Sequence, residues 1–136
     1  MPIAEGVPAG RLAAFRVLVV GAGISGILMA IRLAEAGVAC VVVDKNDGLG
    51  GTWFENVYPG CRVDVANHFY CYSFEPNPDW SEFYSRQPEI RAWLERCADR
   101  HGIRPSLRLH TEVESAAWDE DAALWRVVLR GRDGTR

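Results

Sequence analysis

The sequence lacks a long uncharged hydrophobic run, a Cys-x-x-Cys pair and an excess of basic residues. Its longest stretch without charge, residues 17–31, contains three glycines and lies between two arginines. This stretch is too short for a transmembrane helix. Residues 1–15 also lack the basic start, apolar stretch and cleavage site of a signal peptide, so we expect a cytoplasmic protein.

Charge and cysteine usage exclude further classes of protein. The 136 residues carry 15 Lys and Arg against 18 Asp and Glu, a net charge of −3, which gives no electrostatic footprint for nucleic acid or an anionic membrane. The three histidines are separated, and we assign them no metal-binding or catalytic role. The spacing of the cysteines suggests neither zinc nor a redox pair, so we expect four free thiols: Cys40, Cys61, Cys71 and Cys97.

The order of elements near the start predicts a strand, a helix and a second strand. Residues 1–15 resemble a mobile leader, and the β-branched run 16–20 then leads directly into glycines, as a buried parallel strand does. Apolar residues at helical spacing follow, with Gly37 as the stop, and residues 39–43 form a second buried strand. We therefore expect a parallel strand pair with a right-handed helical crossover.

The rest of the chain predicts a long loop, a helix and more strands. Residues 45–77 have no sustained periodicity, and a loop of that length usually serves a function. A short helical turn is expected over 80–85, capped by Asp79, and then a helix that begins at Pro88 and ends at Gly102. The predicted strands are 107–109 and a hairpin of 112–118 with 124–129, whose apolar face holds Trp125, Val127 and Leu129.

A Gly-x-Gly-x-x-Gly pattern carries the first chemical signal. Gly21, Gly23 and Gly26 lie between the first strand and the helix, and Asp44 follows Gly26 by 18 positions at the end of the second strand. Gly21 permits the tight turn, Gly23 lets a pyrophosphate approach the backbone, and Gly26 allows close packing of the helix on the strand. Asp44 would accept hydrogen bonds from a ribose diol. The pattern predicts a dinucleotide site but leaves FAD and NAD open.

A second motif is more specific. The run Gly48-Leu-Gly-Gly-Thr-Trp53 continues as Asn56-Val-Tyr-Pro-Gly60, Arg62 and Asp64. With these residues the sequence, from about Val17 to Trp125, resembles the class B flavoprotein monooxygenases, and within them the Baeyer-Villiger type.

The resemblance implies an α/β fold of Rossmann-like FAD-binding type, with a parallel sheet, three layers and a C-terminal β-hairpin. Residues 16–136 would then be the truncated N-terminal part of an FAD/NAD(P)-binding domain. In such enzymes NADPH reduces FAD, oxygen is captured as a flavin peroxide, and this attacks a ketone to give an ester or lactone. The resemblance assigns Asp64 a catalytic role beside the flavin, and it implies these cofactor-binding residues: Gly21, Gly23, Ile24, Ser25, Gly26, Asp44, Lys45, Gly51, Thr52, Trp53, Asp64, Val65 and Tyr70.

Several assignments have a structural alternative. Asp64 could form an Asx turn, Trp53 and Tyr70 could be core aromatics, and Arg62 could be a surface charge. Tyr72 is best interpreted as core. Other interpretations of the whole chain are an N- or S-oxidising flavin-containing monooxygenase, another two-dinucleotide flavoenzyme, or a non-catalytic dinucleotide-binding module.

The family's later motifs are absent from these 136 residues, including the second glycine motif for NADPH and the fingerprint around a histidine. A missing C-terminal polypeptide would supply them, and the chain alone would not turn over. Its last segment places an Asp-Gly turn after a strand with no strand to return, which leaves an unpaired edge. We therefore expect the isolated chain to be poorly soluble or to bind FAD weakly.

Overall fold

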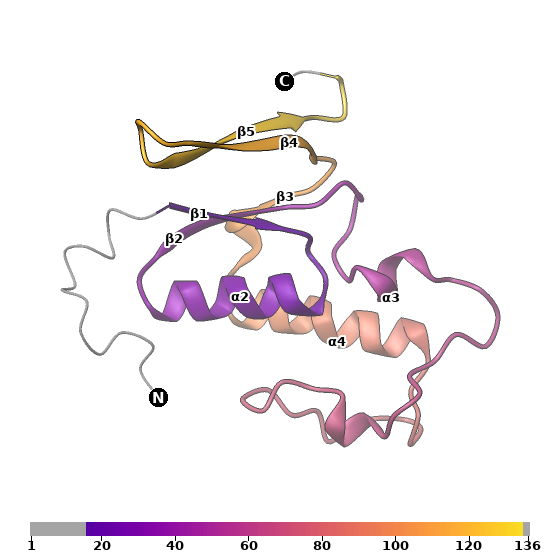
Figure 1. Ribbon diagram of the computed structural model, residues 1–136. Helices are drawn as coiled ribbons and strands as arrows, with labels where there is room; N and C mark the ends of the chain where they lie inside the picture. Colours follow the sequence, from indigo (N-terminus) through magenta and orange to yellow (C-terminus); the bar gives the residue numbers. More distant parts are fainter. Residues whose placement is uncertain (1–15, 135–136) are drawn as a thin grey trace.

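A strand, a helix and a second strand form the centre of the fold. The computed structural model describes residues 16–134, so the leader expected at 1–15 lies outside the described residues. Strand β1 (Arg16–Val20) leads into helix α2 (Ile24–Glu35) and strand β2 (Ala39–Val43), and the two strands pair in parallel with Val19 opposite Val42 (Figure 1). Gly37 follows the C-cap of α2 at Ala36 and takes the left-handed φ of 70°, which stops the helix. This unit is confirmed as the sequence predicted it.

The remaining elements follow a long connection. It holds a one-turn helix, α3 (Thr52–Glu55), and a 3-10 turn, η1 (Asn67–Phe69), neither of which was predicted. Helix α4 (Gln87–Arg100) follows and includes Pro88 in its first turn. A 3-10 turn, η2 (Arg104–Ser106), leads into strand β3 (Leu107–Arg108), and strands β4 (Glu112–Asp119) and β5 (Leu124–Arg130) form the expected hairpin.

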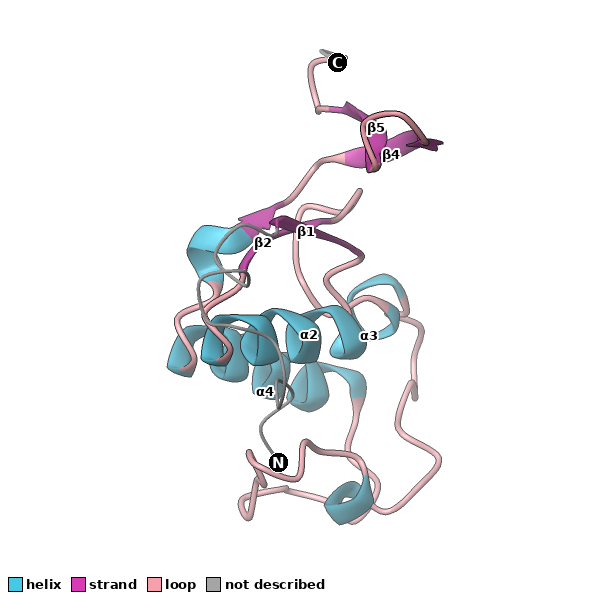
Figure 2. Ribbon diagram, turned by 60° about the vertical axis from the view of Figure 1, so that its left-hand side comes forward, coloured by secondary structure: helices cyan, strands magenta, loops and turns pink. Residues whose placement is uncertain are grey.

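The elements stack in layers around the parallel sheet. The sheet has the order β1-β2-β3, with helices α2 and α4 on one side and the β4-β5 hairpin on the other, which confirms the Rossmann-like α/β class (Figure 2). The core lies between the sheet and the helices. Its fully buried side chains include Ile27, Ile31, Val42, Ile90 and Leu94, and Trp93, Cys97 and Tyr72 are also core residues, as expected.

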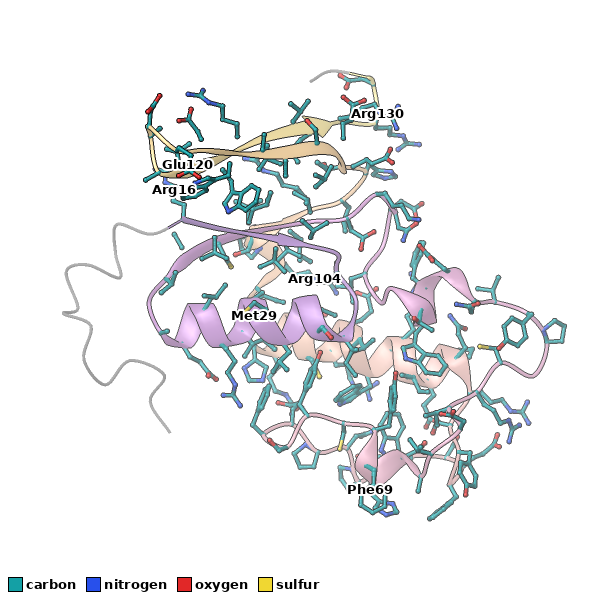
Figure 3. The ribbon with its side chains drawn as sticks, in the orientation of Figure 1. Arg16, Met29, Phe69, Arg104, Glu120 and Arg130 are labelled. Atoms are coloured by element: carbon teal, nitrogen blue, oxygen red, sulfur yellow. The ribbon has the colours of Figure 1, made fainter. Side chains whose placement is uncertain are left out.

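The hairpin carries an aromatic pair on one face. Trp118 and Trp125 are cross-strand partners with ring centroids 5.7 Å apart, and both remain substantially exposed. Figure 3 shows Glu120, in the hairpin turn, above Arg16 at the start of β1. The predicted apolar face is therefore present, but only Val127 and Leu129 on β5 are half-buried.

The helical turn expected over 80–85 is wrong. Residues 81–84 form bends, because backbone groups of this segment bond to another segment of the chain. The amide of Val63 donates to the carbonyl of Ser85, and the amide of Asn67 donates to that of Phe83. The buried side chain of Asn67 adds bonds from its Nδ2 to Glu82 O and Ser85 Oγ, each 2.5 Å, and it accepts the amide of Ser85 at 2.8 Å. Tertiary pairing thus replaces local helical bonds here.

Candidate dinucleotide-binding site

The first glycine motif forms the turn between β1 and α2. Gly21 has a φ of 98°, which disfavours any side chain, and its amide donates to the carbonyl of Val43 at 2.7 Å. A Cβ on Gly26 would lie 1.8 Å from the carbonyl oxygen of Gly21, so the helix packs on the turn without room for a methyl group. The first turn of α2, whose amides have no intrahelical partner, therefore lies against the turn at the end of β1.

Asp44 holds this turn against the tip of β2. The residue is 7% exposed, and its carboxylate accepts the amide of Ala22 on Oδ2 at 2.6 Å and the amide of Asn46 on Oδ1 at 2.9 Å. Both oxygens thus already have a protein donor, although each retains a second lone pair. The residue expected to read a ribose therefore also has a structural role.

The second glycine cluster lies directly against the first. The amide of Gly50 donates to the carbonyl of Ala22 at 2.8 Å, and a Cβ on Gly51 would lie 2.9 Å from the Cα of Gly23. Gly51 also has a φ of 55°. Two loops more than twenty residues apart in the sequence therefore meet backbone to backbone, and together they form the floor of a site that helix α3 borders.

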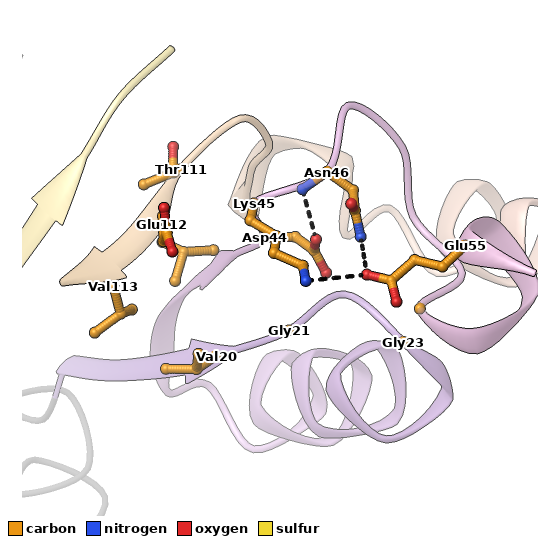
Figure 4. A pocket seen from close by; sticks show the side chains of 12 residues that line it. Val20, Gly21, Gly23, Asp44, Lys45, Asn46, Glu55, Thr111, Glu112 and Val113 are labelled. Carbon is orange, nitrogen blue, oxygen red and sulfur yellow. Dashed lines mark hydrogen bonds and ion pairs between the residues drawn. The ribbon is translucent and has the colours of Figure 1, made fainter. Parts of the chain in front are cut away.

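Two cavities lie next to each other over these glycines. The first, shown in Figure 4, has a volume of about 330 Å³ and extends from the turn to Asp44, Lys45 and Glu55. The second has a volume of about 310 Å³ and extends to Thr52, Trp53 and Tyr70. The residues that line both cavities are Val20, Gly21, Gly23 and Gly51. The result is one elongated groove that crosses the N-terminus of α2.

Aromatic side chains border the second cavity. The Nε1 of buried Trp53 donates to the hydroxyl of Tyr70 at 3.0 Å, and the two rings meet edge to face with centroids 5.6 Å apart. Tyr72 donates its hydroxyl to the carbonyl of Ile24 at 2.6 Å, and burial raises the pKa of Tyr72. The loop after α3 is thereby anchored beside the first turn of α2, with a ring pair at the end of the groove.

Most residues predicted for the site lie along this groove. Those that line it are Gly21, Gly23, Ile24, Ser25, Gly26, Asp44, Lys45, Gly51, Thr52, Trp53 and Tyr70. Asp64 and Val65 are exposed and line neither cavity. Arg62 pairs with Glu82 at 3.4 Å on the surface, which favours its interpretation as a surface charge.

The sequence interpretation missed seven residues of the first cavity, two of which, Val20 and Val43, end the first two strands. Asn46 and Glu55 come from the β2 tip and α3, and residues 111–113 come from the segment that enters β4. The amide of Thr111 donates to the carbonyl of Asp44 at 2.8 Å, which draws that segment to the groove. Among the other five, only Asn46 could have been suggested by the sequence, because it lies two residues after Asp44.

The groove suits a dinucleotide chemically. Helix amides supply donors for a pyrophosphate at its centre, carboxylates lie at one end, and the edge-to-face pair of Trp53 and Tyr70 lies at the other. Apart from Gly21 itself and its two chain neighbours, no described residue has an atom within 4 Å of the place where a Cβ on Gly21 would be, so the backbone there leaves open space that a phosphate could occupy. Within residues 16–134 no cluster of His, Cys, Asp or Glu could hold a metal, and no helix is long and apolar enough to cross a membrane.

Comparison with known proteins defines the class to which this fold belongs. Residues 19–86 match the family described as the NAD(P)-binding Rossmann-like domain, and the chain is a member of that family. It is also similar to a Baeyer-Villiger monooxygenase of Pseudomonas aeruginosa, with 45% identity over 113 residues, which covers 82% of this chain and 21% of that protein.

Solved structures show the same likeness. The structure of an oxidized steroid monooxygenase bound to NADP matches with a TM-score of 0.80 and 41% identity, over 85% of this chain and 23% of that one. A structure of OTEMO in complex with FAD and NADP matches with a TM-score of 0.80 and 36% identity, over 86% and 23%. The chain thus spans about a fifth of the length of the proteins it resembles.

Proposed function

We propose that this chain forms the FAD-binding N-terminal part of an NADPH-dependent monooxygenase of Baeyer-Villiger type. The observation that carries the proposal is the groove of two adjoining cavities, which extends from Asp44 across the paired glycine loops to Trp53 and Tyr70. The similarity to Baeyer-Villiger monooxygenases supports it independently. The substrate would be a ketone or a similar apolar molecule, the co-substrate would be molecular oxygen, and the site of action would be the cytoplasm.

The residues of the groove divide the work of holding FAD. Asp44 and the β2 tip would bind the adenosine ribose, and the amides of Ile24, Ser25 and Gly26 would bind the pyrophosphate. Thr52, Trp53 and Tyr70 would contact the flavin. When bound, FAD supplies the redox chemistry by which an oxygen atom is inserted into the substrate.

Asp64 would act beside the flavin as a charged group, together with the neighbouring Val65. Both residues are exposed in the chain as it stands, so a bound cofactor or further polypeptide has open access to them. The binding site for NADPH would lie largely in polypeptide beyond these 136 residues, which agrees with the small share of the related proteins that the chain covers.

Cofactor choice tests the proposal. We expect the purified chain to bind FAD at least about tenfold more tightly than FMN, because only a dinucleotide reaches both the carboxylate end and the aromatic end of the groove. Flavin fluorescence titration measures both affinities, and chromatography of released cofactor identifies what the chain carries from the cell. Equal affinity for FMN and FAD, or a folded chain that binds no flavin, would refute the proposal.

A further inference from the structure

The first cavity contains a carboxylate that the dinucleotide pattern does not predict. Glu55 lies on α3, facing Asp44 and Lys45 along the wall of this cavity (Figure 4). Its Oε1 accepts the Nδ2 of Asn46 at 2.9 Å and lies 3.4 Å from the Nζ of Lys45. Its Oε2 makes no hydrogen bond or ion pair with any residue that the structure describes, so it remains an acceptor for a ligand.

Glu55 is ionised at neutral pH. The hydrogen bond from Asn46 and the nearby ammonium of Lys45 hold the pKa of Glu55 below its usual value. Its side chain is 46% exposed, so the carboxylate stays hydrated and accessible from the cavity. In contrast, both oxygens of Asp44 already accept backbone amides. Glu55 therefore has more free acceptor capacity than Asp44.

The cavity is also poor in positive charge. Lys45 is the only basic residue among the described residues that line it, and its ammonium forms an ion pair with Glu55. A 2′-phosphate on a ribose needs an uncompensated Arg or Lys, whereas a ribose diol needs a carboxylate acceptor. The cavity therefore supplies a carboxylate acceptor, and the charge of its one lysine is compensated by Glu55.

We propose that Glu55 determines the nucleotide specificity of this cavity, because it accepts the hydroxyl groups of an unphosphorylated ribose and excludes a 2′-phosphate. The inference rests on the proposed function, since it assigns the ribose end of the FAD site. It explains how a protein that uses both FAD and NADPH would exclude the nucleotide with a 2′-phosphate, NADPH, from the first cavity.

Two probes that differ only in the 2′-phosphate test this specificity. ADP-ribose and 2′-phospho-ADP-ribose are titrated into the full chain by calorimetry, beside FAD. We expect the wild-type chain to prefer ADP-ribose by at least about thirtyfold. In Glu55→Gln the carbonyl oxygen still accepts from Asn46, but Lys45 is released, so the preference falls by about tenfold.

A matched control isolates the position from the change in net charge. Glu35→Gln removes the acid of another exposed ion pair, with Arg32 at 2.6 Å, at the far end of α2 from the groove. We expect this variant to keep the wild-type preference. In the wild-type chain, added salt should also narrow the preference, because the exclusion is electrostatic. This second measurement needs no substitution, so the inference stays testable if a variant fails to fold.

The outcomes separate the two proposals. If FAD and ADP-ribose bind but the preference is absent, unaffected by salt or unchanged in Glu55→Gln, the role of Glu55 is refuted while the FAD site stands. If neither FAD nor ADP-ribose binds to folded chain, the proposed function itself fails, and the inference fails with it.

Discussion

Replacing Gly26 by alanine would show how tightly α2 is packed on the glycine turn. The added Cβ would lie 1.8 Å from the carbonyl oxygen of Gly21 and 3.0 Å from its carbonyl carbon. Ordinary contacts to a methyl carbon are about twice that shorter distance. Because the obstructing atom belongs to the backbone, the helix or the turn has to move, and no side-chain rotation can relieve the clash.

The expected loss follows from two opposing terms. Overpacking a tight site costs up to about 3 kcal/mol, whereas alanine gains about 1 kcal/mol over glycine inside a helix. We therefore expect Gly26→Ala to lower the free energy of unfolding by about 2 kcal/mol, which corresponds to roughly 8 °C in Tm for a domain of this size. Thermal denaturation followed by circular dichroism measures this shift.

Gly23→Ala is the matched control for stability. A Cβ on Gly23 would be 3.5 Å from the Cα of Gly51, an ordinary contact, and the φ of −81° at Gly23 suits alanine. Its Tm should stay within a few degrees of wild type. A Gly26→Ala variant as stable as wild type, or one no less stable than Gly23→Ala, would refute the packing argument.

Four further results are expected. Gly23→Ala should weaken FAD binding by at least about tenfold in a fluorescence titration, because a methyl group intrudes where the groove approaches the pyrophosphate; unchanged affinity would move the phosphate site elsewhere. Asn67→Ala should lower the free energy of unfolding, measured with urea, by about 3 kcal/mol, because it leaves the partners of a buried amide unsatisfied. A loss below about 1 kcal/mol would mean that other contacts hold the loop. Tyr70→Phe should cost about 1 kcal/mol through the lost bond from Trp53, and no change in stability would mean that solvent replaces it. Partial burial raises the pKa of Glu89, but hydrogen bonds from Ser85 and Ser81 outweigh this effect and leave the pKa lowered. Ionised Glu89 therefore stabilises the fold at neutral pH, and this stabilisation is lost as the pH falls below about 4.5. Glu89→Gln should therefore reduce the acid sensitivity of unfolding, and identical pH profiles for variant and wild type would count against that role.

Much of the site could be read from the sequence because its signals are local. The strand, glycine turn, helix and second strand depend on neighbouring residues, through β-branched runs, helical spacing and the φ that only glycine adopts freely at position 21. The position of Asp44 follows from the end of the second strand. The hairpin was equally predictable, because two alternating runs flank an acidic turn.

Contacts between distant segments decided the rest. Nothing near Gly51 in the sequence indicates that it packs against Gly23, and nothing near Glu55 places it beside Lys45. The helical turn expected over 80–85 was wrong because that segment forms hydrogen bonds with Asn67, which lies well before it in the sequence. Backbone dihedrals and periodicity are properties of a short stretch of chain, whereas the groove and its charge depend on which stretches fold together. The sequence therefore determined the type of fold and the phosphate turn, and the tertiary structure decided which carboxylates and glycines meet around it.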